Sequence, residues 1–106
     1  MTRYTKQTPF TYTERKIVDD LERCVCNVLN VEPEQVKNKN IKTNVTLARG
    51  FIFYILHKKY DFSVGLISKL YKRSIRNVYW HNDKIEHFLK QNSYKEIYNN
   101  IITGLK

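Results

Sequence analysis

Apolar residues recur along this chain at steps of three and four positions, and this periodicity constrains the fold more than any other feature. Within residues 13–30 the periodic positions are Ile17, Leu21, Cys24, Val25 and Val28. Within residues 45–59 they are Ala48, Phe51, Ile52, Ile55 and Leu56, a stripe broad enough for a central, buried helix. Three glycines and two prolines leave little material for the many turns of an all-β fold. We therefore predict an all-α fold, a compact bundle of five to six helices.

Residues that favour helix ends divide the chain into elements. We expect an irregular arm over residues 1–12 and one helical domain over residues 13–106, with Thr13 capping the first helix. Pro33 suits the first turn of a short second helix. Asn44 can cap the central helix, and Ser93 can cap a last helix from Tyr94 to about residue 104. The stretch between the second and central helices, residues 38–43, has no periodicity and is predicted to be a basic loop.

A short helix, a tight turn and a longer helix are predicted over residues 63–91. Ser63 caps a helix that ends at residue 70 or 71, and Ser74 caps one that reaches about residue 91, with Lys72 and Arg73 in the turn. This is the helix-turn-helix layout, in which the second helix places its first turn in the major groove of DNA. A helical wheel centres the inner face of that helix on Val78, with Ile85 and Leu89 close beside it and with Ile75 and Phe88 flanking it.

The residues at the start of the longer helix carry donors suited to DNA. Arginine offers a bidentate fork to guanine and asparagine offers one to adenine. Backbone amides at the helix start can also hold a phosphate. The candidate reading residues are Arg73, Ser74, Arg76 and Asn77, with Trp80 one turn further. Three placements stay open for Trp80: contact with a thymine methyl or a sugar, packing under the last helix, and packing under the N-terminal arm.

Positive charge is concentrated in the middle of the chain. Residues 1–36 carry five Lys/Arg and six Asp/Glu, whereas residues 37–90 carry twelve Lys/Arg and three Asp/Glu. The formal net charge of +9 is therefore located almost wholly in the segment that contains the helix-turn-helix. Such asymmetry is typical of a protein that binds a polyanion.

Several motifs occur in the order found in one known family. Lys37 to Lys42 form a basic stretch, Ala48-Arg49 open the central helix, and Ser63-Val64-Gly65-Leu66-Ile67 open the helix-turn-helix. With Val78 and Lys84-Ile85 near the end of the second helix, residues 16–88 resemble the C-terminal DNA-binding domain of the bacterial replication initiator DnaA, a Trp-repressor-like fold. The resemblance implies a DNA-docking architecture in which the basic loop, with Lys37, Lys39 and Lys42, reaches the minor groove. Candidate phosphate contacts are Arg49, Lys58, Lys59, Lys69 and Lys72.

The chain also departs from that family. The family has Gly-Arg-Asp-His-Thr-Thr at the start of its recognition helix, and this chain has Lys72-Arg73-Ser74-Ile75-Arg76-Asn77, so only the arginine carries over. The family's target box is therefore not implied. A Gly-rich phosphate loop is absent from the sequence, so ATP hydrolysis is not implied either.

Other classes of function have little support in the sequence. The histidines at 57, 81 and 87 lack the i, i+4 spacing of a metal site, and no nucleophile motif occurs. Cys24 and Cys26 are interpreted as small apolar fillers in a reducing, cytoplasmic setting. No apolar run reaches the roughly 18 residues of a membrane span. We expect neither enzyme activity nor a metal, a cofactor, a small-molecule substrate or a membrane.

The sequence thus favours binding of double-stranded DNA by a small regulator, a replication-associated factor or a phage protein. The alternative is a protein-interaction or virion-structural module on the same scaffold. It would dock a partner protein on the surface of Tyr79 and Trp80. A homodimer also stays open, although the sequence shows no dimer interface. RNA binding is a third hypothesis, and no RNA-module signature supports it.

Overall fold

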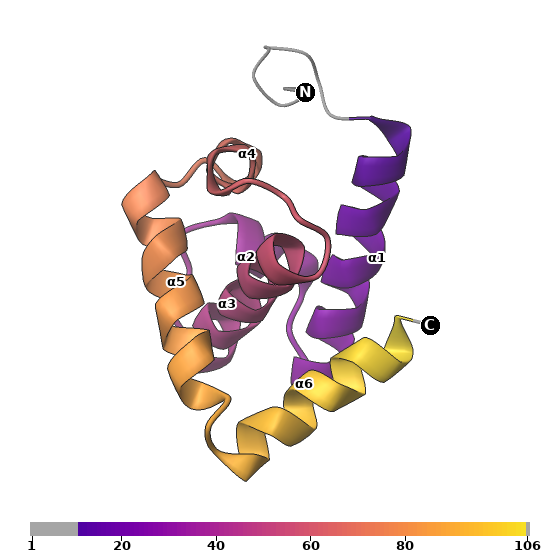
Figure 1. The fold of residues 1–106 in the computed structure, drawn as a ribbon, viewed down its shortest axis with the longest axis vertical. Helices are drawn as coiled ribbons and strands as arrows, with labels where there is room; N and C mark the ends of the chain where they lie inside the picture. Colours follow the sequence, from indigo (N-terminus) through magenta and orange to yellow (C-terminus); the bar gives the residue numbers. More distant parts are fainter. Residues whose placement is uncertain (1–10, 106) are drawn as a thin grey trace.

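The computed structural model describes residues 11–105, which form six helices and no strand (Figure 1). The helices are α1 (Tyr12–Leu29), α2 (Pro33–Lys37), α3 (Thr43–Lys58), α4 (Val64–Tyr71), α5 (Ile75–Phe88) and α6 (Asn92–Gly104). This architecture confirms the predicted all-α bundle. The arm expected over residues 1–12 lies outside the described residues, except for its last two positions.

Those two positions belong to the first helix, so the predicted start at Thr13 is wrong. Thr11 is the N-cap, and its hydroxyl accepts the N–H of Glu14 at 3.1 Å. The Glu14 carboxylate in turn accepts the N–H of Thr11 at 2.8 Å, which completes a capping box. The helix ends as predicted at Asn30, which adopts the left-handed conformation with a φ of 59°.

Helix α3 occupies the centre of the bundle and packs against α1, α2, α4 and α5. Its apolar stripe is fully buried, as the breadth of the stripe predicts. Gly50 lets α5 approach closely, since a Cβ there would lie 3.0 Å from Ile85 Cδ1. The helix begins at Thr43, after Lys42 at the N-cap position, and the cap predicted at Asn44 is not used.

The C-terminal helix closes the core from one side. In Figure 1, α6 lies across one end of α1, and these two helices are in contact. Ile101 is buried, and the Cys24 thiol donates to its carbonyl at 3.2 Å. Cys26 is buried as well, and burial raises the pKa of its thiol to about 11. Both cysteines lie in apolar packing, in agreement with their interpretation as fillers. The helix begins at Asn92 after Gln91 at the N-cap position, so the cap predicted at Ser93 is wrong.

A buried polar link ties three helices together beside this core. The Tyr71 hydroxyl of α4 donates to the Glu22 carboxylate of α1. Lys37, the last residue of α2, places its Nζ 3.5 Å from the other oxygen of that carboxylate. Burial, followed by the negative charge of Glu22, raises the pKa of Tyr71 well above its ordinary value. The tyrosine is therefore a neutral donor that satisfies a buried carboxylate.

Within residues 11–105, no helix is both long enough and apolar enough to cross a membrane.

Candidate nucleic-acid interface

The segment from α4 to α5 forms the predicted helix-turn-helix, with both serine caps in use. Ser63 accepts the N–H of Leu66 at 3.0 Å, and Ser74 accepts the N–H of Asn77 at 3.0 Å. Between them, Lys72 adopts the left-handed conformation with a φ of 54°, which turns the chain sharply at the end of α4. Helix α5 ends at Phe88, three residues before the predicted end. The prediction of this layout is therefore confirmed, apart from the length of its second helix.

Hydrogen bonds inside the turn hold the start of α5 in place. The N–H of Arg73 donates to the Ser68 carbonyl at 3.0 Å, and the Ser68 hydroxyl donates to the Arg73 carbonyl. This pair of bonds crosses the turn from α4, so α4 braces α5. Lys69 and Lys72 are exposed around the turn.

Four of the sequence-predicted reading residues lie together. Ser74 and Arg76 are exposed at the start of α5, and Asn77 is half-buried beside them. With Trp80 these residues line one shallow depression of about 380 Å³. The Arg76 guanidinium and the Ser74 hydroxyl on this open surface can donate to the edges of bases. The Asn77 side-chain oxygen is buried without a hydrogen-bond partner, so this amide is less available than the sequence suggests.

The basic loop, residues 38–42, is shaped by its own asparagines. The Asn38 side chain accepts the N–H of Asn40 at 2.8 Å, and the Asn40 side chain accepts the N–H of Lys42 at 2.9 Å. These local bonds replace the regular bonds of a helix or strand and give the loop a defined course. Lys39 and Lys42 are exposed on it. Lys37 is the last residue of α2 and forms an ion pair with Glu22, so its charge is only partly available at the surface of the basic loop.

Arg49 is not a phosphate contact, which corrects the assignment made from the sequence. Its side chain is 2% exposed and lies beneath the loop. The guanidinium donates to the carbonyls of Val36 at 3.0 Å, Gln35 at 3.2 Å, Asn38 at 3.0 Å and Asn40 at 3.1 Å. Burial, followed by the positive charge of Arg73, lowers its pKa to about 10, so it stays protonated at neutral pH. Arg49 anchors the loop to α3.

Arg73 connects the same loop to the helix-turn-helix. Its Nη2 donates to the Asn38 carbonyl at 2.7 Å, the oxygen that also accepts from Arg49. The loop and the turn before α5 are 35 residues apart in sequence, and one shared carbonyl places them side by side. Arg73 is half-buried, and one of its guanidinium nitrogens already donates to the loop. Arg76 is exposed and is therefore more available to a ligand.

His81 and Asn82 are buried on the inner face of α5, a placement missing from the sequence prediction. The His81 ring is 3% exposed and lies edge-on to Phe53, with 5.2 Å between ring centroids. Burial, followed by the charges of Arg49 and Arg73, lowers its pKa to about 4. The ring is therefore neutral at pH 7 and adds no positive charge to those of Arg49 and Arg73. Ile75, which was expected to flank the inner face, is 51% exposed.

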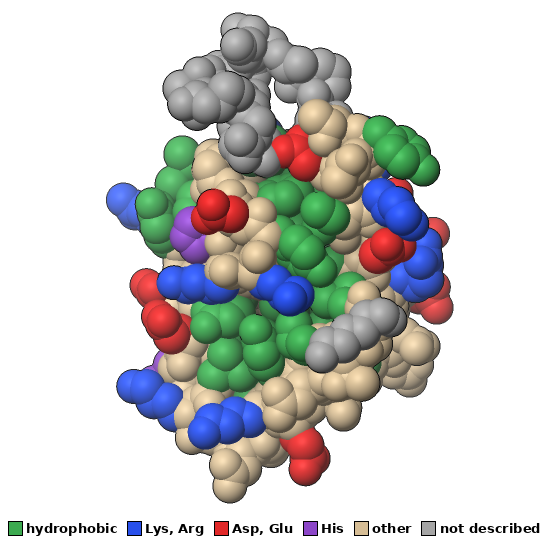
Figure 2. All heavy atoms as spheres, turned by 45° about the vertical axis from the view of Figure 1, so that its right-hand side comes forward, with side chains coloured by type: hydrophobic (Ala, Val, Ile, Leu, Met, Phe, Trp, Pro, Cys, Tyr) green, Lys and Arg blue, Asp and Glu red, His purple; other side chains and the backbone are tan. Residues whose placement is uncertain are grey.

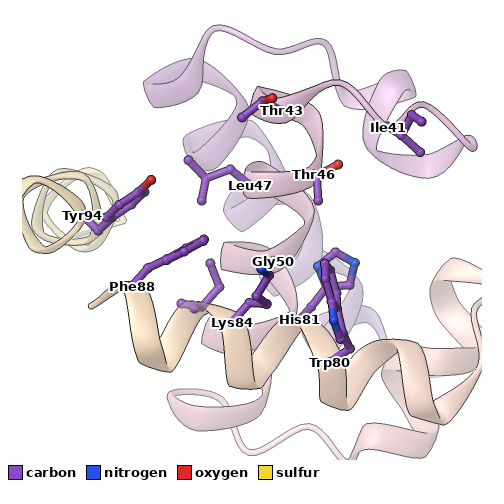
Figure 3. Close-up of a pocket in the computed structure, with 11 residues that line it drawn as sticks. Ile41, Thr43, Thr46, Leu47, Gly50, Trp80, His81, Lys84, Phe88 and Tyr94 are labelled. Atoms are coloured by element: carbon purple, nitrogen blue, oxygen red, sulfur yellow. The ribbon is translucent and has the colours of Figure 1, made fainter. Parts of the chain in front are cut away.

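Trp80 lies at one end of a groove between α3 and α5. Its side chain is 48% exposed, and its ring stands edge-on to His81 with Lys84 Nζ 5.2 Å from the ring centroid. Figure 3 shows Tyr94 of α6 at the opposite end of this groove, so Trp80 is not packed under the last helix. The groove has a volume of about 280 Å³, and Ile41 of the loop also lines it. The placement of Trp80 under the N-terminal arm lies outside the described residues.

The remaining lysine candidates lie elsewhere. Lys58 and Lys59 are exposed at the C-terminal end of α3. The basic loop precedes the other end of this helix, roughly 20 Å away. Figure 2 turns the α1 side forward and shows acidic and basic side chains mixed there. Lys16 and Arg23 both pair with Asp20 on α1, at 3.5 and 3.3 Å. The candidate phosphate contacts that lie near the reading residues are therefore the exposed lysines of the loop and the turn.

No group of histidine, cysteine and carboxylate side chains among residues 11–105 has the arrangement of a metal site. No protein-family model matches the chain, and no curated protein matches it.

Proposed function

We propose that this protein binds double-stranded DNA, as a regulator or a replication-associated factor, and that its role is binding rather than catalysis. The first turn of α5 would enter the major groove, and the loop of residues 38–42 would lie on the adjacent minor groove. The observation that carries the proposal is the Asn38 carbonyl shared by Arg49 and Arg73. It joins two cationic elements from distant parts of the sequence into one surface.

The exposed groups on this surface divide into two roles. Lys39, Lys42, Lys69 and Lys72 are free to approach phosphates, which positions the protein without reading sequence. Arg76 stands exposed at the start of α5, where its fork of donors can reach guanine. Asn77 follows it, but its side-chain oxygen is buried, so it does not present both amide groups to adenine. The capped start of α5 also presents the positive end of the helix dipole to a phosphate.

Fluorescence anisotropy against salt tests the proposal directly. A labelled AT-rich duplex should bind, with an affinity that falls steeply as salt rises because bound counterions are released. Arg76→Ala should weaken binding by roughly 5- to 150-fold, which corresponds to about 1–3 kcal/mol. Lys39→Ala and Lys42→Ala should each lower the salt slope by about 1.

Lys95→Ala is the matched control, because Lys95 is exposed on α6 and its removal changes the net charge equally. It should leave affinity and slope nearly unchanged. The absence of binding at low salt by folded protein would exclude the proposal. A loss in Arg76→Ala no larger than in Lys95→Ala would exclude the assignment of α5 as the reading helix.

A protein-docking role is the second candidate, because three large apolar residues stand half-exposed on one helix. They are Ile75, Tyr79 and Trp80 of α5. On a DNA-binding surface such groups contact sugars and thymine methyls, and on a docking surface they anchor a partner protein. Trp80→Ala distinguishes the two roles, since it should reduce DNA affinity only in the first.

A further inference from the structure

Ile41 stands out among the apolar residues of this surface. Its side chain is 85% exposed, more than that of any other large apolar residue within residues 11–105. It lies in the basic loop, two residues after Lys39 and one residue before Lys42. The transfer of an isoleucine side chain from water to an apolar environment lowers the free energy. Nothing in the described part of the chain covers this isoleucine.

The backbone on both sides of Ile41 is held firmly. The Asn40 carbonyl accepts from Arg49 at 3.1 Å, and the Lys42 N–H donates to the Asn40 side chain at 2.9 Å. Two residues before Asn40, the Asn38 carbonyl accepts from both Arg49 and Arg73. Ile41 itself has a stiff, β-branched side chain with few rotamers. The loop therefore presents a rigid apolar tip between two cations.

Ile41 and Trp80 border the same groove, Ile41 from the loop and Trp80 from α5 (Figure 3). A duplex that accepted the first turn of α5 in its major groove would bring its backbone and adjacent minor groove towards this tip.

We propose that Ile41 is a wedge that enters a base step of the minor groove and kinks the DNA. This inference rests on the proposed function and adds an architectural activity to it. Proteins that bend DNA from the minor groove insert apolar side chains, isoleucine among them, between base pairs and produce kinks of roughly 20–90°. Lys39 and Lys42 hold the phosphates on the two sides of the opened step. Pyrimidine–purine steps such as TA unstack most easily and are the preferred sites.

Energy transfer between dyes at the two ends of a duplex of about 30 base pairs measures the bend. The probe is an AT-rich duplex with a central TA step, and the full chain is added to saturation so that differences in affinity do not enter. Wild type should raise the transfer efficiency, and Ile41→Ala should lose most of that increase while still saturating the duplex. Ile41→Leu should restore the bend because it keeps an apolar wedge. Lys42→Ala should weaken binding and keep the bend at saturation.

The possible outcomes distinguish a failure of the proposed DNA binding from a failure of the wedge alone. An absence of anisotropy change with wild type excludes DNA binding and the wedge together. Binding without a bend, or an equal bend in wild type and Ile41→Ala, overturns the wedge alone and leaves the proposed function in place. Because Ile41 is almost wholly exposed, thermal unfolding of Ile41→Ala should match wild type, which separates a lost bend from a lost fold.

Discussion

Acidification from pH 7 to pH 5 should weaken the fold by about 2 kcal/mol through His81 alone. In the folded protein, burial first and then the charges of Arg49 and Arg73 lower the pKa of this imidazole to about 4. In the unfolded chain the same group titrates near its ordinary value of 6.5. Between these two values the unfolded chain binds a proton that the folded protein does not bind. The free energy of unfolding therefore falls as the pH falls through this window.

The magnitude follows from the two pKa values. Each pKa unit between folded and unfolded states corresponds to about 1.4 kcal/mol. At pH 7 nearly all of the stabilisation by the neutral ring is present, and the loss reaches about 3 kcal/mol by pH 4. His81 is only 3% exposed, so water screens little of this difference.

Urea unfolding at pH 7 and pH 5 measures the effect in three proteins. Wild type should lose about 2 kcal/mol between the two conditions, and His81→Gln should lose much less because glutamine does not titrate. His87→Gln, which removes an exposed histidine from the same helix, should lose as much as wild type. The carboxylates are common to all three proteins, so the difference between variants isolates His81. An equal loss in wild type and His81→Gln would refute the reasoning.

Two further variants test the polar interior. Arg49→Met removes four hydrogen bonds to main-chain carbonyls and should lower the free energy of unfolding by about 3 kcal/mol in urea titrations, with faster hydrogen exchange at the amides of residues 40 and 42. Unchanged stability would contradict its role as the anchor of the loop. Tyr71→Phe leaves the Glu22 carboxylate without its hydroxyl donor and should cost about 1–3 kcal/mol, seen as a drop of several degrees in melting temperature. A melting temperature equal to that of wild type would show that Lys37 suffices for Glu22.

The start of each helix could be predicted where one residue had a single favourable role. Ser63 and Ser74 each precede an apolar periodic run, and both cap the helix that follows. Near the N-terminus both Thr11 and Thr13 could cap the first helix. Thr11 does so because Glu14, three residues later, completes a capping box with it. Lys16, three residues after Thr13, cannot complete a capping box because it has no acceptor. The capping-box pattern in the sequence therefore distinguishes the two threonines, although hydrophobic periodicity alone does not.

The candidate site was less predictable, because its key bonds end on the main chain. Arg49 lies three positions before Ile52 and seven before Leu56 on α3, so its burial could have been predicted, but its carbonyl partners leave no trace in the sequence. His81 follows Val78 by three positions, which places it on the inner face by the same periodicity that buries Ile85. Ile75 also lies about 60° from Val78, on the other side, and is exposed, so the periodicity alone does not distinguish these two positions.

The basic loop is attached to the helices through its carbonyl oxygens, so its attachment does not depend on the side chains that it exposes. Arg49 and Arg73 bind atoms that every amino acid possesses, so the side chains at positions 39, 41 and 42 take no part in the attachment. Mutation can therefore exchange these three side chains and retune what the loop touches without disturbing the helices beneath. Single substitutions at these positions can therefore change which ligand groups the loop contacts while its backbone keeps the same conformation.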